Sequence, residues 1–267
     1  MNCAYVTLIC NGDAYLPGVE ALGESLKATG TSKLMVAMAS ADVSEETRAR
    51  LEAQGWQIRD IAPLHKAGAQ PLFPRFDDVF AKLRAWQLTE FDKVVLLDAD
   101  TLVLQNIDEL FLRPYFAAAP DFLMPDRFNS GVMVLDPSEE TFARMVEVLD
   151  KAPTYDGGDQ GFLNTFFADW FAMPVAHRLP AGYNLMHFIL QFLRGHPVLQ
   201  RSLEREAKVI HYAIQKPWHA APQLSGAAQD WWQMYARVHP ELDTDWRHRV
   251  HKLEDRTFDR VIEAFIR

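Results

Sequence analysis

Val94-Val95-Leu96-Leu97-Asp98-Ala99-Asp100 is an apolar run closed by two carboxylates. The run predicts a strand that is buried on both faces of a sheet, because all of its side chains are apolar. Open α/β sheets bind their ligands outside the carboxyl ends of such strands. Residues i and i+2 of a strand face the same side, so Asp98 and Asp100 can reach one divalent cation. The alternative is a pair of acids that caps the next turn.

A second Asp-x-Asp, Asp243-Thr244-Asp245, has the same spacing in a different setting. A polar stretch rather than an apolar run precedes it, and Trp246 follows it. We expect this second copy to lie on the surface. The strand before the acids, and not the tripeptide itself, therefore singles out Asp98 and Asp100.

Short apolar runs alternate with amphipathic stretches in the first half of the chain. We expect strands at residues 5–9, 33–38, 56–61, 93–97 and 130–135. We expect helices at residues 16–26, from Ser44 onward, at residues 77–90 and from about Ser138. This order predicts an α/β fold with a mostly parallel central sheet flanked by helices and joined by right-handed crossovers.

The pattern changes beyond residue 155, where aromatic-rich helical stretches surround one further apolar run, Val209-Ile210. Residues 185–201 are expected to form a lid over an acceptor or, as the favoured alternative, a packed helix. Trp231 and Trp232 are adjacent and cannot both face one side of a helix, so we expect them to pack in a core. The polar stretch from Trp231 onward is expected to be a packed helix pair or a mobile tail.

Composition and charge argue against several classes of protein. Of the 267 residues, 49% are hydrophobic and 24% are charged, as expected for a globular protein with a sizeable core. The 27 basic and 36 acidic side chains leave a net charge of −9, which disfavours a nucleic-acid partner. Cys3 and Cys10 are too few for a disulfide framework or a thiolate zinc site. No apolar run reaches the length of a membrane span and no signal peptide is evident, so we expect a soluble cytoplasmic protein.

Asp156-Gly157-Gly158-Asp159-Gln160 is a second group of candidate functional residues. The two glycines let the backbone pass close to a ligand, and Asp159 and Gln160 then begin a predicted helix. A carboxylate and an amide held at a rigid helix start suit recognition of sugar hydroxyls. The alternative is a plain turn in which Asp159 is the N-cap.

Two more polar groups lie beside predicted strands. His211 directly follows Val209-Ile210, and Lys216 comes soon after it. A histidine at a strand end can complete the coordination of a metal, and a nearby lysine can balance phosphate charge, although a lone histidine is also a common structural residue. Phe128-Asn129-Ser130-Gly131 leads into a strand, where its small polar groups can reach a substrate hydroxyl or simply form a turn.

Taken together, these blocks resemble the glycogenin-like members of glycosyltransferase family 8 over residues 4 to about 218. The blocks that carry the resemblance are residues 4–8 with Asn11 and Tyr15, residues 81–86, 97–104, 106–111, 128–132, 156–161, 163–167 and 183–185, and His211 with residues 216–218. Their order and spacing make the resemblance specific.

The resemblance implies a GT-A nucleotide-diphospho-sugar transferase fold and sugar transfer with retention at the anomeric carbon. It implies UDP-glucose as the donor of first choice and Mn²⁺, or alternatively Mg²⁺, as the ion. By matching position, the metal ligands are Asp98, Asp100 and His211. The donor contacts are Leu8, Asn11 and Tyr15 at the uracil, Ala99 beside the metal, Arg75 and Lys216 at the diphosphate, and Lys82, Asn129, Ser130, Asp156, Asp159 and Gln160 around the sugar.

The resemblance also implies a catalytic domain over residues 1–218, with a nucleotide half at about 1–110 and an acceptor half at about 111–218. Residues 219–267 form a helical extension in this interpretation. Asp159 is the candidate nucleophile of a double displacement, Gln160 the support of a same-face route, and Lys216 the group that balances the leaving diphosphate. The choice between the two routes stays open.

Three departures from the family pattern change the expectations. Gly12 adds a residue between Asn11 and Tyr15, and the segment between His211 and Lys216 is one residue shorter and lacks glycine. Glycogenins glucosylate their own tyrosine after the Tyr-Asn-Leu block, but no tyrosine lies between Tyr183 and Tyr212 here. We therefore expect a separate acceptor, such as a sugar, a polyol, a lipid-linked glycan or another protein.

Two alternatives of other classes remain open at this stage. The chain is either a transferase, or a nucleotide-sugar-binding or scaffold protein that has lost transfer, or a UDP-sugar hydrolase. The complete set of Asp98, Asp100 and His211 favours the transferase, because a protein that had lost transfer activity would not require three metal ligands. A homodimer is a further expectation if an apolar patch covers the second half of the chain.

Overall fold

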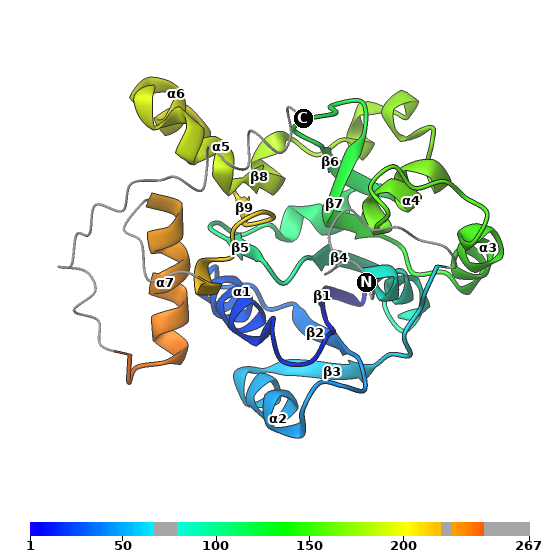
Figure 1. Cartoon of the computed structure of the whole chain (residues 1–267), viewed down its shortest axis with the longest axis horizontal. Helices are drawn as coiled ribbons and strands as arrows, with labels where there is room; N and C mark the ends of the chain where they lie inside the picture. The colour runs from blue at the N-terminus through cyan, green and yellow to red at the C-terminus, as the bar shows by residue number, and fades with distance from the viewer. Residues whose placement is uncertain (67–78, 220–225, 243–267) are drawn as a thin grey trace.

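The computed structural model describes residues 1–66, 79–219 and 226–242. A six-stranded sheet with the order β3-β2-β1-β4-β7-β6 lies at its centre (Figure 1). Its strands are β1 (Cys3–Ile9), β2 (Leu34–Ala39), β3 (Trp56–Asp60), β4 (Lys93–Leu97), β6 (Ala117–Pro120) and β7 (Phe128–Leu135). Strands β3, β2, β1 and β4 are parallel, whereas β7 runs antiparallel to both β4 and β6. The predicted α/β fold with a mostly parallel central sheet is confirmed.

Helices cover both faces of this sheet. The α-helices are α1 (Leu16–Ala28), α2 (Glu45–Gln54), α3 (Glu139–Leu149), α4 (Asp159–Phe166), α5 (His187–Phe192), α6 (Pro197–Glu206) and α7 (Gly226–Val238). Short 3₁₀ segments lie at Val79–Gln87, Asp108–Leu112, Trp170–Ala172, Val175–His177, Ala181–Asn184, Leu193–Gly195 and Pro217–His219. The side chains of Ser44 and Ser138 cap α2 and α3 by accepting a backbone N–H three residues on, at the two helix starts that the sequence predicts.

The stretch expected to be a helix at residues 77–90 is a 3₁₀-helix, Val79–Gln87, where it is described. Its apolar side chains Phe80, Leu83 and Trp86 are all buried and stand three residues apart. A 3₁₀-helix has three residues per turn, so this spacing places the three side chains on one line against the core.

The two faces of the central sheet make two separate cores, as alternation along buried strands requires. In β4, Val95 and Leu97 pack with α1 and α2, whereas Val94 and Leu96 pack with the 3₁₀-helix, α3 and α4. All five residues of β4 are buried, which confirms the strand buried on both faces that the apolar run predicts.

A second, three-stranded sheet carries the far side of the site. It has the order β5-β9-β8, with strands β5 (Thr101–Val103), β8 (Leu185–Met186) and β9 (Val209–His211). Antiparallel pairing sets Thr101 opposite His211, and the Tyr212 backbone N–H donates to the Asp100 carbonyl oxygen over 2.8 Å. This register carries His211 back beside the Asp-x-Asp, across more than 100 residues of sequence.

Helix α7 belongs to this packed structure. Trp231 is fully buried in a third core, with Leu102 and Ile210 of the small sheet and Ala21 of α1. The expected core packing of Trp231 is therefore confirmed, and Trp232 packs against the same core while half-buried. None of the described helices combines the length and the apolar character that a membrane crossing needs.

Candidate active site at the carboxyl end of β4

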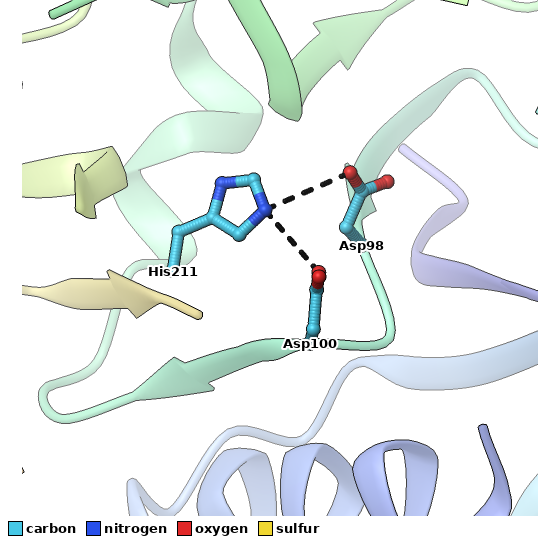
Figure 2. Close-up of side chains that lie close together, drawn as sticks. All are labelled: Asp98, Asp100 and His211. Atoms are coloured by element: carbon cyan, nitrogen blue, oxygen red, sulfur yellow. Dashed lines mark ion pairs between the residues drawn. The ribbon is translucent and has the colours of Figure 1, made fainter. Parts of the chain in front are cut away.

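Asp98, Asp100 and His211 converge where β4 ends (Figure 2). One ligand atom from each lies within 4.8 Å of the other two. The His211 Nε2 atom is 3.2 Å from Asp100 Oδ1 and 3.9 Å from Asp98 Oδ2. Two carboxylates and an imidazole are a donor set that suits a divalent cation such as Mn²⁺ or Mg²⁺, so these residues fit the metal that the sequence predicts.

Lys82 connects the candidate metal ligand Asp98 with Asp159, in the region expected to bind the sugar. Its Nζ atom lies 2.8 Å from Asp98 Oδ1 and 2.8 Å from Asp159 Oδ2, and it donates to Ser130 Oγ over 3.3 Å. The Ser130 hydroxyl in turn donates to Asp159 over 2.8 Å. Burial acts to lower the pKa of Lys82, but Asp159 and Asp98 outweigh it and raise that pKa above its ordinary value.

Lys216 balances the other carboxylate. Its ammonium contacts Asp100 Oδ2 and donates to the carbonyl oxygens of Tyr212 and Ala213 over 3.1 and 3.0 Å. Burial acts to raise the pKa of Asp100, but the charge of Lys216 is the largest opposing effect, and the pKa lies well below its ordinary value. Burial raises the pKa of Asp98, against the opposing effect of Lys82. The two acids are thus neutralised by two different lysines.

The residues expected at the uracil lie at the carboxyl end of β1, beside β4 in the sheet. Leu8 belongs to β1, Asn11 follows it in the left-handed region with a φ of 62°, and Tyr15 immediately precedes α1. The inserted Gly12 also has a positive φ, of 66°, and its N–H donates to Asp42 over 2.7 Å. Glycine adopts this conformation without strain, so the turn accommodates the extra residue.

Tyr15 lies beside Lys216, the lysine expected at the diphosphate. The Lys216 Nζ atom is 5.8 Å from the centre of the Tyr15 ring, and that ring packs edge-on against Trp218. Lys216 therefore lies beside Tyr15, one of the residues expected at the uracil.

The Asp156 loop holds the start of α4 in place. The Asp156 carboxylate accepts from the Thr154 hydroxyl and from the backbone N–H groups of Gly158 and Gly161, over 2.8, 2.9 and 3.1 Å. The N-cap of α4 is Gly158, and Asp159 is the first helical residue, so the alternative with Asp159 as N-cap is wrong. The Asp156 contacts shape the backbone of this loop, and they leave the Asp159 side chain directed at Lys82 and Ser130.

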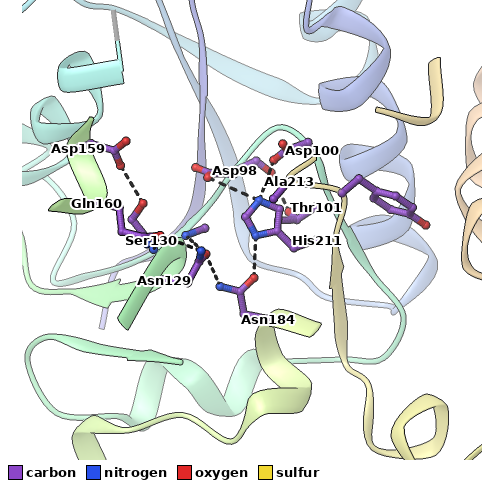
Figure 3. A network of polar contacts seen from close by, with 12 residues as sticks. Asp98, Asp100, Thr101, Asn129, Ser130, Asp159, Gln160, Asn184, His211 and Ala213 are labelled. Atoms are coloured by element: carbon purple, nitrogen blue, oxygen red, sulfur yellow. Dashed lines mark hydrogen bonds and ion pairs between the residues drawn. The ribbon is translucent and has the colours of Figure 1, made fainter. Parts of the chain in front are cut away.

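The described structure brings most of the predicted residues together, and Figure 3 shows part of the cluster. Asp98, Asp100, His211, Lys82, Lys216, Ser130 and Asp159 are linked by the contacts above, and Asn129 joins them through Gln160. Arg75 and Asp243-Thr244-Asp245 lie outside the described residues, so the structure adds nothing to their predictions.

Sequence reasoning missed two polar residues in this cluster. Asn184 bonds to His211 Nδ1 over 2.9 Å, and Asp121 accepts from Gln160 over 3.3 Å. A signal was present for Asp121, which follows the short run Ala117-Ala118-Ala119-Pro120 of β6 as a carboxylate at a strand end. Asn184 stands in the Tyr-Asn-Leu block that supports the family resemblance, but no pattern there indicates its partner.

Comparisons with known proteins agree with this architecture. The sequence profile of the family described as "Glycosyl transferase family 8" matches residues 6–121 and 115–221. Glycogenin-1 of Homo sapiens is 40% identical over 222 residues, which are 81% of this chain and 62% of the human protein. Glycogenin-1 of Caenorhabditis elegans is 36% identical over 280 residues, 97% of this chain and 64% of that protein. The chain thus spans just under two thirds of the length of these glycogenins.

Other relatives use other sugars. Inositol phosphorylceramide glucuronosyltransferase 1 of Arabidopsis thaliana is 36% identical over 249 residues, 86% of this chain and 43% of that protein. Among solved structures, the galactosyltransferase LgtC, in complex with donor and acceptor sugar analogs, superposes with a TM-score of 0.66 at 20% identity, over 92% of this chain and 99% of that chain. The chain belongs to glycosyl transferase family 8 and has the GT-A fold of that family.

Proposed function

We propose that this protein is a metal-dependent, retaining glycosyltransferase that moves a hexose, glucose as first choice, from a UDP-sugar to an acceptor other than its own tyrosine. Family membership implies the UDP-sugar donor. The observation that carries the proposal is the convergence of Asp98, Asp100 and His211, flanked by two buried lysines. The proposed catalytic unit spans residues 1–218, with residues 219–267 as an extension.

Asp98, Asp100 and His211 would hold the cation, with Mn²⁺ as first choice and Mg²⁺ as the alternative. A divalent cation at this place supplies Lewis-acid stabilisation of a departing diphosphate. Lys216 supplies a second positive charge beside Asp100, and in a buried setting such a charge acts strongly on a developing anion. Lys82 keeps Asp98 and Asp159 in fixed relative positions through its two ion pairs.

The sugar side of the site is proposed to be Asp159 and Gln160 at the start of α4, with Ser130 beside them. In a double displacement, an Asp159 oxygen attacks the anomeric carbon as UDP leaves, and the acceptor hydroxyl then displaces Asp159, whose released carboxylate takes the hydroxyl proton. In the same-face route, the acceptor attacks from the side that UDP leaves and gives its proton to the departing diphosphate, while Gln160 supports the sugar. Both routes retain the anomeric configuration, so both agree with the proposal.

The proposed acceptor is a separate molecule, because residues 184–211 contain no tyrosine to receive glucose in the segment where glycogenins carry theirs. The donor is the less constrained part, since the relatives include glycogenins and a glucuronosyltransferase. A donor panel must therefore contain UDP-glucuronate besides UDP-glucose, UDP-galactose and UDP-xylose.

The test is release of UDP from this panel, with Mn²⁺, with Mg²⁺ and with a chelator, by the wild type and by Asp100→Asn. We expect metal-dependent release from one sugar, lost in the variant, and faster release when an accepting sugar or polyol is added. Release that is unchanged in Asp100→Asn contradicts the metal site. Release that no acceptor accelerates favours a hydrolase, and UDP binding without release favours a binding protein.

A further inference from the structure

We propose that Asn184 is a positioning residue that fixes the tautomer of His211. It does so as part of a series of hydrogen-bonded side-chain amides that all donate in the same direction. The series runs from His211 through Asn184, Asn129 and Gln160 to Asp121, and most of it is visible in Figure 3. The inference rests on the proposed role of His211 as a metal ligand. Its consequence is that Nε2, and not Nδ1, is the nitrogen offered to the cation.

The direction of the series is set at Asn129. The backbone N–H of Gly131 donates to Asn129 Oδ1 over 2.9 Å, and a backbone N–H can only donate. A flipped Asn129 amide would set its NH₂ group against that donor. The Asn129 oxygen is therefore fixed where the structure has it, with the NH₂ group directed to Gln160 Oε1 over 2.7 Å.

Asn184 transmits this direction to the imidazole. Its NH₂ group donates to the fixed Asn129 oxygen over 2.8 Å, so its own oxygen faces His211 Nδ1 at 2.9 Å. An amide oxygen only accepts, so Nδ1 must carry a hydrogen. Nε2 then points at the two carboxylates, and in the neutral imidazole it is the bare nitrogen, so Nε2 and the carboxylate oxygens together make a cation site.

The Gln160 amide, at the other end of the series, is also held in one orientation. The Gln160 NH₂ group donates to Asp121 Oδ2 over 3.3 Å and to the Tyr155 hydroxyl over 3.1 Å. An ionised carboxylate only accepts, so Gln160 also has one permitted orientation. The Gly131 N–H, which fixes Asn129, and the Asp121 carboxylate, which fixes Gln160, thus require mutually compatible amide orientations.

Asn129 has no hydrogen-bonding capacity left over for a sugar in this arrangement. Its oxygen accepts from Gly131 and Asn184, and its NH₂ group donates to Gln160 and, over 3.4 Å, to Asp121. These contacts use both lone pairs and both hydrogens of the amide. The Gln160 amide is equally occupied, so at either residue a sugar hydroxyl would have to replace one of the present contacts. In this arrangement Asn129, expected at the sugar, is also a positioning residue of the same series of amides.

Burial makes the orientation costly to change. Asn184, Asn129 and His211 are 5%, 8% and 4% exposed. Reversing one amide would leave a buried donor facing a donor, and an unmet buried polar group has a cost far larger than that of an exposed one. Outer partners of metal-binding histidines typically change metal affinity 10- to 100-fold when they are removed.

Two substitutions at one position test the inference. Asn184→Leu keeps the approximate volume and removes the acceptor from His211. Asn184→Asp keeps an acceptor at His211 but sets a carboxylate oxygen, in place of a donor, against Asn129 Oδ1. We expect Asn184→Leu to weaken binding of Mn²⁺, measured by titration in the presence of UDP, by about 10- to 100-fold. We expect Asn184→Asp to stay within about threefold of the wild type, because a carboxylate is itself a common outer partner of metal-bound histidine.

Melting temperatures in chelator separate positioning from a structural role. A merely structural Asn184 predicts that both variants lose stability and metal affinity in parallel. Equal Mn²⁺ affinity of wild type and Asn184→Leu, or an equal loss in both variants, would overturn the inference. Asp100→Asn is the reference variant. If Asp100→Asn loses Mn²⁺ binding and Asn184→Leu does not, the role of Asn184 is contradicted but the metal site is not. If Asp100→Asn binds Mn²⁺ with wild-type affinity, the metal site is contradicted as well.

A second readout needs neither metal nor a substitution at position 184. ¹⁵N NMR of histidine-labelled wild-type protein, in alkaline buffer with chelator, reports which nitrogen of each neutral imidazole carries the hydrogen. We expect Nδ1–H at His211, assigned by the signal that His211→Gln lacks. An Nε2–H tautomer at His211 would overturn the inference, even if Asn184→Leu failed to fold.

Discussion

Lys82 is a buried cation with two anionic partners, one at the proposed metal site and one at the start of α4. Removing one member of a buried ion pair is destabilising because the other charges stay behind uncompensated. Lys82→Met should therefore lower the free energy of unfolding by about 3 kcal/mol in urea titrations with chelator. Lys27→Met, which removes an exposed lysine, is the control and should change it by less than about 0.5 kcal/mol. A Lys82→Met protein as stable as wild type would contradict this account.

Gly131 stands against the imidazole. A methyl group added at Gly131 would contact the His211 ring, 2.5 Å from Nδ1, and lie 3.0 Å from Asn129 Oδ1. Gly131→Ala should therefore displace His211 and reduce metal-dependent UDP release on the order of 10²-fold. The matched control is Gly195→Ala, because an added methyl group there meets no atom within 4 Å. Equal activity of the two variants would show that the position of His211 does not matter.

Local patterns predicted some of the candidate site residues. Asp98, Asp100 and His211 each follow an apolar run, which made them candidates beside structural alternatives, and the family resemblance then favoured them as metal ligands. Asn184 was not predictable, because its partners His211 and Asn129 lie 27 and 55 residues away in sequence. A buried asparagine acquires its role from tertiary contacts, which no local pattern contains.

Glu109, in the 3₁₀ segment Asp108–Leu112, contacts the segments just before β8 and β9. It accepts from the Tyr183 hydroxyl over 2.6 Å and pairs with Lys208. Burial acts to raise the pKa of Glu109, but the hydrogen bonds from Lys208 and Tyr183 outweigh it and lower that pKa below its ordinary value of 4.5. A lowered folded-state pKa means that the stabilisation is complete above 4.5 and is lost as the pH falls through the folded-state value.

Chemical denaturation at several pH values measures this effect. The stability difference between wild type and Glu109→Gln should be constant near neutral pH and shrink below pH 4.5. Glu52→Gln, at an exposed position of α2, should show a small difference at every pH. A Glu109→Gln difference that is flat with pH, or that grows on acidification, contradicts the role of this contact.

The spacing of apolar residues and the helix-start signals located most helices and strands, but they did not give the direction in which a strand runs. Serine followed by acids located the start of α2, the start of α3 was expected at about Ser138, and the apolar runs located β1, β2, β3, β4, β7 and β9. The antiparallel course of β7 depends on the chain first passing through the small sheet and β6, which the strand's own residues do not encode. The short run of β6 is mostly alanine and carries little strand preference, so it went unpredicted.

The third core joins the small sheet, α1 and α7, and Trp231 is its largest fully buried side chain. Its ring packs on Tyr235 and Trp218 at centroid distances of 5.0 and 5.6 Å. Replacing a buried tryptophan by alanine costs about 3–5 kcal/mol, so Trp231→Ala should lower the free energy of unfolding by that amount. Trp232→Ala, beside it and half-buried, should cost less than half as much.

Urea unfolding followed by circular dichroism distinguishes an integral α7 from an appended one. An integral helix predicts a single transition, shifted to lower urea in Trp231→Ala. If α7 were an independent appendage, Trp231→Ala would leave the main transition unchanged.

Anomalous diffraction at the manganese edge, from crystals of the full chain grown with Mn²⁺ and UDP, would locate the bound cation. We expect one strong peak bounded by Asp98, Asp100 and the Nε2 atom of His211, in contact with the UDP diphosphate. Bound UDP without a peak there, or a peak held by other residues, would contradict it.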